Sequence, residues 1–354
     1  MYNNGVYFLK GLPPHRGHLS AILRASTQCK HLHVVVSDHK DLKARLCEEA
    51  GIDYIPLGLR VQWLATETQD MPHITVYGMD ETHLREYPHG WPDWARLLDD
   101  TVPRHIDCFF VGEPEYEPSL RQYFPQADVV VFDPERTAYP ISATQIRHNP
   151  LEHWDYILGP ARPYFAKKVL IAGGESTGKT TLTKMLAKLF HTSWSEEYGR
   201  YYAERFLGGD ETHFTDKDFA EIALRQHIQD QDALRAANRI CFFDTDAVIT
   251  QKFSQLYMGH ANPVVDTFID PSKYDFVLLL KPDVEWVDDG MRLHGEDADR
   301  WRIFQELKEE YESRGFRVIE LEGDYKHRLA RALNIILEET GLFPNGKTLL
   351  TRKE

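Results

Sequence analysis

Short apolar runs alternate with longer polar and amphipathic stretches along the chain. After a first run, VYFL at 6–9, they read HVVVSD at 33–38, ITVYG at 74–78, DCFFVG at 107–112, VVVFD at 129–133, VLIAG at 169–173, ICFFD at 240–244, FVLLL at 276–280 and RVIEL at 317–321. Continuous apolar runs separated by helix-length segments are typical of parallel strands that are buried on both faces. The pattern therefore predicts an α/β fold built on parallel sheets.

The rhythm of strands breaks once, in the segment HNPLEHWDYILGPARPYF at 148–165, where Pro and Gly cluster. The 354 residues amount to about twice the length of a typical domain of roughly 150 residues. We therefore expect two domains, residues 1–165 and 166–344, followed by a tail at 345–354.

The composition of the chain limits the binding partners and the cellular compartment that we expect for the protein. The 41 Lys and Arg against 55 Asp and Glu give a formal net charge of −14, which disfavours nucleic acid as a partner because such binding relies on clustered cations. No apolar run reaches the roughly 18 residues of a membrane span, and no secretory signal is recognisable. The cysteines Cys29, Cys47, Cys108 and Cys241 show no CxxC spacing, which favours reduced packing residues. We expect a cytoplasmic protein without membrane contact, and homo-oligomerisation stays open.

The run at 169–173 leads into a phosphate-loop motif. In VLIAGGESTGKTTLTKMLAKLF, the spacing G-x-x-x-x-G-K-[ST] is met by Gly173, Gly178, Lys179 and Thr180. Backbone N–H groups of such a loop wrap phosphates, the lysine reaches the outer phosphates, and the threonine ligates Mg²⁺. The predicted ATP-binding residues are Gly173, Gly174, Glu175, Ser176, Thr177, Gly178, Thr180 and Thr181. The alternative is a Gly-rich turn without a ligand.

The strand ICFFD ends in a carboxylate that a magnesium site needs. Asp244 closes the run, and Asp246 faces the same side if the chain stays extended. One carboxylate would join Thr180 in the metal shell, for which we assign Asp244, and the other would accept a proton from a hydroxyl nucleophile, so this pair favours a small-molecule kinase. The alternative is a pair of turn residues.

A polar segment at 288–302 contains Arg292, Arg300 and Arg302. A lid that brings arginine over the transferred phosphoryl group is the functional interpretation, and Arg292 is the assigned ATP-binding residue. A solvated loop is the alternative.

A second chemical pattern lies near the N-terminus, where VYFL runs into KGLPPHRGHLSAILRA. His15, Gly17 and His18 form an H-x-G-H triplet at a strand-to-helix turn. Two imidazoles and a helix N-terminus there favour binding of a triphosphate. The enzyme would then align a substrate phosphate against the α-phosphorus of ATP without a covalent nucleophile.

The segment ISATQIR at 141–147 is the companion of this triplet. Ser142 and Thr144 stand at a predicted helix start, and Arg147 lies one turn later, so the three could form a second anion clamp. A plain helix cap is the alternative.

Together, H-x-G-H and ISxTxxR resemble the adenylyltransferases of the nucleotidyltransferase superfamily, and the order of parts resembles the NadR family. Further matching segments are YPHGW at 87–91, DPERT at 133–137, ARPYFAK at 161–167, EYGR at 197–200, LGGDE at 207–211, DTD at 244–246 and EWVDDGMR at 285–292. The chain departs from the family at Leu9, where the first motif has glycine. Some members carry an N-terminal helix-turn-helix, which we do not expect here because the first strand begins by about residue 5.

The resemblance implies a Rossmann-like nucleotidyltransferase domain followed by a P-loop kinase domain, both with parallel sheets. It implies phosphorylation of ribosylnicotinamide by ATP in the C-terminal half and adenylyl transfer from ATP to nicotinamide mononucleotide in the N-terminal half, giving NAD and pyrophosphate. Catalytic roles would fall to His15, His18, Arg147, Lys179, Asp244 and Asp246. Gly17, Ser142 and Thr144 would bind ATP with them, and Tyr87, Pro88, Gly90, Trp91, Glu197, Tyr198, Arg200 and Trp286 would bind substrate.

Two rival hypotheses stay open. Leu9 motivates an enzyme in which only the kinase is active and the N-terminal half senses nucleotide. The second rival is a regulatory protein that senses NAD or ATP and acts through a partner.

Overall fold

The computed structural model describes residues 1–354 except 86–88, 136, 210–212, 285–296 and 349–354. The chain divides into two compact units, Met1–Arg162 and Pro163–Glu354, close to the expected boundary at residue 165. Each unit contains one five-stranded sheet in which every pairing is parallel. The α/β fold with parallel sheets is therefore confirmed.

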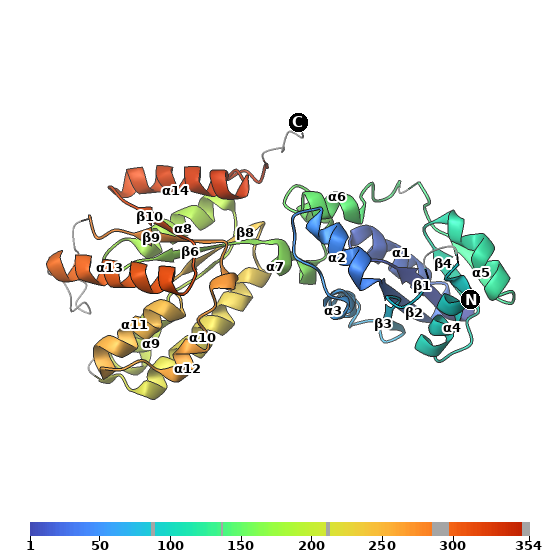
Figure 1. Ribbon diagram of the computed structural model, residues 1–354, viewed down its shortest axis with the longest axis horizontal. Coiled ribbons are helices and arrows are strands. Elements are labelled where there is room, and N and C mark those ends of the chain that lie inside the picture. Colours follow the sequence, from blue (N-terminus) through green and yellow to red (C-terminus); the bar gives the residue numbers. More distant parts are fainter. Residues whose placement is uncertain (86–88, 136, 210–212, 285–296, 349–354) are drawn as a thin grey trace. The chain divides into compact units, whose positions relative to one another are not determined.

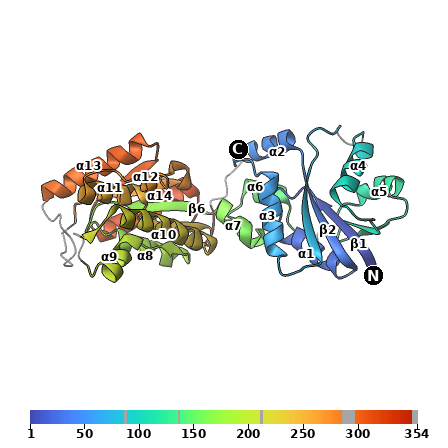
Figure 2. The same ribbon diagram turned by 90° about the horizontal axis from the view of Figure 1, so that it is seen from below.

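The N-terminal unit has the strand order β3-β2-β1-β4-β5. Its strands are β1 (Tyr2–Leu9), β2 (Cys29–Asp38), β3 (Ile74–Asp80), β4 (Cys108–Val111) and β5 (Asp128–Val131). Its helices are α1 (Arg16–Ser26), α2 (Lys40–Glu48), α3 (Leu57–Glu67), α4 (Trp91–Thr101), α5 (Glu117–Tyr123) and α6 (Ala143–His148). Helices α1 and α3 cover one face of the sheet, and α4 and α5 cover the other (Figures 1 and 2).

The C-terminal unit has the strand order β10-β9-β6-β8-β7. Its strands are β6 (Lys167–Ala172), β7 (Trp194–Ser195), β8 (Ile240–Asp244), β9 (Phe276–Leu280) and β10 (Val318–Leu321). After α7 (Arg162–Phe165), which spans the boundary, the helices are α8 (Lys179–Phe190), α9 (Tyr198–Phe206), α10 (Asp216–Arg235), α11 (Ala247–Met258), α12 (Pro263–Asp266), α13 (Asp297–Ser313) and α14 (Tyr325–Thr340). In Figure 1, α8 and α14 lie on one side of this sheet and α10, α11 and α13 on the other.

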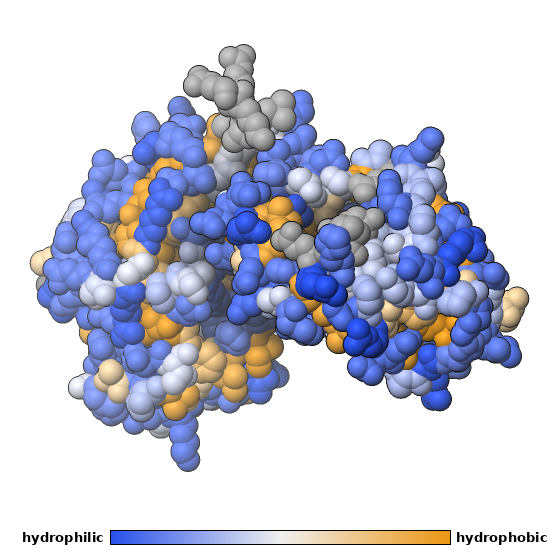
Figure 3. All heavy atoms as spheres, turned by 45° about the vertical axis from the view of Figure 1, so that its right-hand side comes forward, coloured by the Kyte–Doolittle hydropathy of each residue, from blue (hydrophilic) through white to orange (hydrophobic). Residues whose placement is uncertain are grey.

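The apolar runs form strands because both of their faces are covered. All residues of β8 and β9 are buried, and in the N-terminal unit Val6, Val35 and Phe109 are fully buried. The four cysteines are free and buried, as the sequence indicates. On the face shown in Figure 3, hydrophilic residues predominate and hydrophobic atoms are exposed in separate patches. No helix of the described residues has both the length and the apolar character needed to cross a membrane.

In each unit the strands that follow the central strand are added first on one side of it and then on the other, so the loop after the central strand lies where the strand order reverses. In the N-terminal unit, β1 pairs with β2 on one side and β4 on the other. In the C-terminal unit, β6 lies between β8 and β9. Parallel sheets bind ligands at the carboxyl ends of their strands beside such a point. The two predicted phosphate-binding motifs follow β1 and β6, so the fold places both of them at this edge.

Candidate functional site

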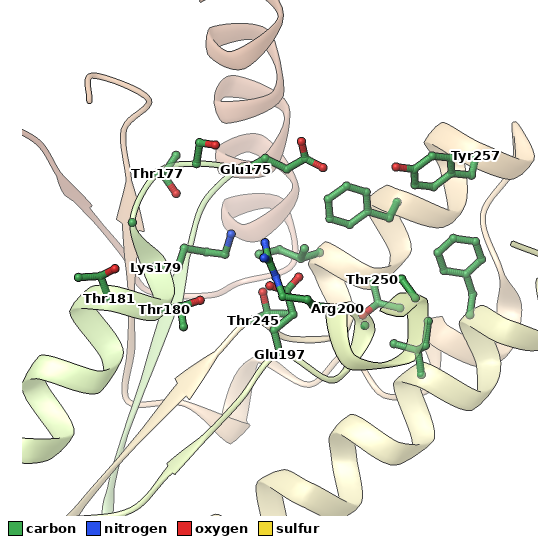
Figure 4. Close-up of a pocket in the computed structure, with 18 of the residues that line it drawn as sticks. Glu175, Thr177, Lys179, Thr180, Thr181, Glu197, Arg200, Thr245, Thr250 and Tyr257 are labelled. Carbon is green, nitrogen blue, oxygen red and sulfur yellow. The ribbon is translucent and has the colours of Figure 1, made fainter. Parts of the chain in front are cut away.

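A cavity of about 280 Å³ lies against the phosphate loop of the C-terminal unit. Lys179 at the start of α8 and Arg200 of α9 both point into it (Figure 4). Of the predicted site residues, it is lined by Glu175, Ser176, Thr177, Gly178, Lys179, Thr180, Thr181, Glu197 and Arg200. The fold therefore gathers residues of the phosphate loop and of the EYGR segment around one space.

The phosphate loop has the backbone geometry that its glycines permit. Gly178 has a φ of 87°, in the left-handed region that glycine adopts readily, and α8 begins at the next residue. The carbonyl of Gly174 accepts hydrogen bonds from Thr177 Oγ1 at 2.8 Å and from Lys179 Nζ at 3.1 Å. The lysine is thus held beside the loop, close to where outer phosphates would bind.

Asp244 ends β8 beside the same loop. It is 1% exposed, and its Oδ2 accepts a hydrogen bond from Thr180 Oγ1 at 2.5 Å. Its Oδ1 is buried without a hydrogen-bond partner among the described residues. Burial, followed by the charge of Glu197, raises the pKa of Asp244 to about 6. The predicted pairing of Thr180 with Asp244 is therefore present in the geometry.

Asp246 does not face the cavity, and this corrects the expectation that it lies on the same side as Asp244. The intervening Thr245 has a φ of 80°, so the chain is no longer extended there. Asp246 instead caps α11, accepting from the backbone N–H groups of Val248 and Ile249. Its Oδ1 also accepts from Tyr311 Oη at 2.6 Å, and burial raises its pKa to about 6. This carboxylate supports the wall of the site.

The turn before α9 holds Glu197 at the cavity. Gln226 of α10 is 3% exposed and accepts a hydrogen bond from Tyr198 N at 2.8 Å. The same amide donates to Ser195 Oγ at 3.0 Å and to the carbonyl of Glu196 at 3.1 Å. The Tyr198 side chain does not line the cavity and packs near Tyr202, with the ring centroids 6.4 Å apart. Of the EYGR segment, only the Tyr198 side chain lies away from the cavity.

The far end of this cavity is aromatic, which the sequence pattern does not reveal. Phe214 lies 5.0 Å from Phe219 and 5.6 Å from Tyr257, measured between ring centroids. Phe253 of α11 also lines the space, together with the polar Thr250. Phe214 and Phe219 belong to the start of α10 and the loop before it, whereas Thr250, Phe253 and Tyr257 belong to α11, so the fold brings these two segments together.

Of the predicted lid arginines, two can be placed. Arg300 is buried and donates to the carbonyl of Val284 at 3.0 Å. Arg302 is half exposed and pairs with Asp299 at 3.0 Å and Glu306 at 3.2 Å. Both are engaged within α13 and its surroundings, and neither lines the cavity. Arg292 and Trp286 lie outside the described residues.

The N-terminal unit has a larger cavity, of about 1130 Å³, at the carboxyl end of β1. Its lining includes His15, Gly17, His18, Gly90, Trp91, Ser142, Thr144 and Arg147. The two histidine rings lie 3.7 Å apart between centroids. His15 Nδ1 accepts from Gly17 N, and His18 Nδ1 accepts from His15 N, both at 3.2 Å. A ring that accepts through Nδ1 carries its proton on Nε2, which is the donor that an oxyanion needs.

The segment ISATQIR begins α6 beside the same cavity. Ser142 forms a capping box with Gln145, so the helix cap that we considered as the alternative is present. Ser142 also lines the cavity. Arg147 is 5% exposed, donates to the carbonyl of Leu12 at 2.6 Å and to Thr144 Oγ1 at 3.1 Å, and burial lowers its pKa. This arginine therefore fixes the loop after β1 in addition to facing the cavity.

The predicted pyridine pocket is only partly described, because Tyr87 and Pro88 lie outside the described residues. Gly90 is required by close packing, since a Cβ there would lie 2.0 Å from the Arg85 carbonyl oxygen. Trp91 is 7% exposed and packs edge-on against Trp94, with centroids 4.9 Å apart. Trp94 also lines the cavity and is more exposed. It is one of several aromatic residues of this lining that the sequence motifs do not single out.

Leu9 ends β1 at 6% exposure and lines the cavity. A Cβ on Gly11 would lie 3.2 Å from its Cδ1, so the leucine side chain folds onto the glycine. Lys43 of α2 is a further residue of this lining that the sequence does not single out. Burial lowers its pKa to about 8, and it donates to the carbonyl of Ser37.

Two parallel sheets, each with a cavity beside the loop after its central strand, define a two-unit nucleotide-binding α/β protein. A family profile described as an AAA domain matches residues 168–328. The trifunctional NAD biosynthesis/regulator protein NadR of Escherichia coli (strain K12) is 34% identical over 343 residues, covering 95% of this chain and 83% of that protein. The chain belongs to the NadR family.

Two solved structures of this family have the same architecture. A NadR protein in complex with NR is 30% identical, with a TM-score of 0.81 and coverage of 96% of each chain. A NadR protein in complex with NAD and AMP-PNP is also 30% identical, with a TM-score of 0.80 and coverage of 97% of each chain. The similarity therefore spans both units.

Proposed function

We propose that the chain carries out two consecutive steps of NAD salvage. The C-terminal unit phosphorylates ribosylnicotinamide with ATP, and the N-terminal unit transfers the adenylyl group of a second ATP to the resulting mononucleotide. The observation that carries this proposal is that a cavity lies beside the predicted phosphate-binding motif of each unit. Relatives that match both units were solved with NR and with NAD and AMP-PNP.

In the C-terminal unit, Glu197 is the group placed to receive the proton of the nucleoside hydroxyl. It lines the cavity opposite the phosphate loop, whereas Asp246 is turned into the protein. As the hydroxyl oxygen bonds to the γ-phosphorus of ATP, its proton passes to the Glu197 carboxylate and ADP leaves. Lys179 moves from the Gly174 carbonyl to the outer phosphates and stabilises their charge.

Magnesium fits the donors beside this loop. Among the described residues, no three His, Cys, Asp or Glu side chains come close enough together to hold a metal ion by themselves. Mg²⁺ in kinases uses one or two protein oxygens, with phosphates and water completing its shell. Thr180 and the buried, unpartnered Oδ1 of Asp244 would hold it. When bound, the ion neutralises the charge on the phosphate oxygens.

The aromatic end of the C-terminal cavity suits the second substrate. A pyridinium ring is flat and cationic, and such rings are attracted to aromatic faces. Phe214, Phe253 and Tyr257 line the cavity. Figure 4 shows Tyr257 on the side away from Lys179, beyond Arg200. The ribosyl hydroxyl group would then point back toward the phosphate loop.

In the N-terminal unit, no side chain needs to act as a nucleophile. A phosphate oxygen of the mononucleotide attacks the α-phosphorus of ATP, and pyrophosphate leaves. The Nε2–H groups of His15 and His18 would stabilise the charge that develops on the phosphates, and Ser142 and Thr144 would add hydroxyl donors. Leu9 leaves this cavity open because its side chain folds onto Gly11.

A coupled time course with the full chain tests the proposal. Ribosylnicotinamide and excess Mg-ATP are added, and the mononucleotide, NAD and pyrophosphate are followed together. We expect the mononucleotide to rise first and NAD and pyrophosphate to follow in equal amounts. If the mononucleotide forms without NAD, only the kinase is active. If neither product forms, the proposed enzyme is wrong and a nucleotide sensor is favoured.

A further inference from the structure

The first turn of α14 packs against the phosphate loop, although no sequence motif marks it. Arg328 of this turn is 2% exposed. Its guanidinium donates to the carbonyl of Thr177 in the loop and to the carbonyl of Lys281 just after β9, the latter at 2.6 Å. It also pairs with the carboxylate of Asp283. One side chain therefore ties three segments of the unit together.

Asp283 extends this connection to the start of α14. Its Oδ2 accepts from the backbone N–H of Gly323 at 2.7 Å, in the turn between β10 and α14. A buried guanidinium is costly unless it is paired and hydrogen-bonded, and an apolar residue of similar size is often tolerated as well or better. The fork of Arg328, which reaches three acceptors, provides what an apolar residue lacks, namely a fixed direction for each of the carbonyl groups.

The direction of the Thr177 carbonyl determines the direction in which the N–H of the next residue, Gly178, points. In a planar trans peptide the C=O and the following N–H point to opposite sides. Because Arg328 holds the Thr177 oxygen toward α14, the N–H of Gly178 points away from α14. Phosphate loops bind anions through such N–H groups, which must all be turned to one side before the nucleotide arrives.

Tyr325, in the same turn, makes the second contact with the loop. A Cβ on Gly178 would lie 2.8 Å from Tyr325 Cε1, so the ring occupies the space in front of this glycine. Gly178 has a φ of 87°, and glycine has more backbone freedom than other residues. The ring therefore limits the alternative orientations of the peptide that Arg328 holds.

We infer that Arg328 is a positioning residue for phosphoryl transfer, which holds the phosphate loop in its ATP-binding form through the Thr177 carbonyl, with Tyr325 as the second contact. The measurement of KM and kcat that tests the inference depends on the proposed kinase function. The measurement of ATP affinity depends only on binding of ATP. Arg328 acts on ATP through the loop and does not line the cavity itself.

The test compares Arg328→Gln and Arg328→Lys with the matched control Arg331→Gln in the full chain. Arg331 lies on the same helix, and its side chain is 56% exposed. The Kd of a fluorescent ATP analogue with Mg²⁺ is measured together with KM and kcat for phosphorylation. The unfolding temperature reports whether each variant is folded, and formation of NAD from nicotinamide mononucleotide reports whether the other unit is unaffected.

Arg328→Gln should weaken binding of the analogue about tenfold or more, as expected when a charge-assisted hydrogen bond is removed. Arg328→Lys should give an intermediate Kd, because it retains the charge and a single donor group. The KM for ribosylnicotinamide should stay within about twofold, and Arg331→Gln should match the unaltered chain.

A folded Arg328→Gln variant that binds the analogue as tightly as the unaltered chain would overturn the inference. If that variant does not fold, Arg328→Lys decides, and unchanged affinity there overturns it equally. The proposed kinase function fails in a different way, namely if the unaltered chain binds the analogue and transfers no phosphate to ribosylnicotinamide. The binding comparison would still decide the role of Arg328 in that case.

Discussion

The two units supply their anion-binding groups in different ways. In the C-terminal unit, the consecutive residues 175–181, which end the phosphate loop and begin α8, line the cavity. In the N-terminal unit, the groups come from two segments, His15–His18 and Ser142–Arg147, and the bond from Arg147 to the Leu12 carbonyl spans 135 residues. The residues of a loop site are adjacent in the sequence and need later segments only to hold their backbone, whereas a divided site has no binding groups together until distant segments have met.

The two units also share a device. In each of them a buried arginine from a later helix donates to a carbonyl in the loop after the central strand, Arg147 to Leu12 and Arg328 to Thr177. Arg147 faces the cavity as well, whereas Arg328 lies behind the loop. Arg147 can therefore contact a nucleotide directly, whereas Arg328 acts only on the loop that binds it.

The largest effect should come from Lys179→Ala, because a single loop with a single lysine serves the C-terminal cavity. Phosphorylation of ribosylnicotinamide should fall roughly 10²- to 10³-fold, the range seen when one preorganised electrostatic group is removed. NAD formation from nicotinamide mononucleotide should be unchanged. Lys188→Ala, at an exposed position of the same helix, is the matched control. Equal loss of both activities would show that the two sites are not independent.

His18→Ala should have a smaller effect, because the donors of the N-terminal cavity are spread over two segments. Adenylyl transfer should fall roughly tenfold to a hundredfold while phosphorylation is spared. The His18 ring also caps α1 by accepting from His15 N, so its loss should lower the free energy of unfolding by about 1 kcal/mol.

His31→Ala, at an exposed position of β2, is the control for His18→Ala. Both activities are measured for each variant, together with the unfolding temperature. If His18→Ala reduced adenylyl transfer no more than His31→Ala does, His18 would not belong to the adenylyl-transfer site, and the proposed N-terminal site would be wrong.

Asp246→Asn should have the smallest effect on turnover and tests which carboxylate faces the reaction. Its amide oxygen can still accept from Tyr311 and from the first N–H groups of α11, so phosphorylation should change by no more than about threefold. Asp244→Asn, the matched change at the carboxylate bonded to Thr180 of the phosphate loop, should reduce kcat far more, roughly a hundredfold. Similar losses in both variants would place Asp246 at the reacting groups and contradict the geometry. Steady-state kinetics at saturating ATP distinguishes the two outcomes.

Much of the fold could be predicted from the apolar runs. Each of them coincides with a strand of the structure, because strands buried on both faces need continuous apolar residues. The strand that the pattern missed, β7, has two residues, Trp194 and Ser195, which are too few to show a period. Phosphate-loop residues were also predictable, since their spacing is local and sets the backbone geometry directly.

The rest of the site depends on information that spacing does not contain. Asp246 was misplaced because one residue, Thr245, leaves the extended conformation and turns the next side chain away. The aromatic end of the C-terminal cavity combines Phe214, which precedes α10, with Phe253 and Tyr257 of α11. Arg328 could have been suspected only from its place just after a strand of the sheet, since parallel strands present their carboxyl ends to one edge.

The position of Arg328 along the chain has a consequence for biosynthesis. The loop residue that it holds, Thr177, precedes it by 151 residues, and α14 is the last helix of the described residues. A growing polypeptide therefore contains every residue of the phosphate loop long before it contains the arginine that orients them. Ligands stabilise only the state that binds them. ATP should thus protect a nascent C-terminal unit less well until α14 has left the ribosome, because the loop without Arg328 is expected to bind nucleotide about tenfold more weakly.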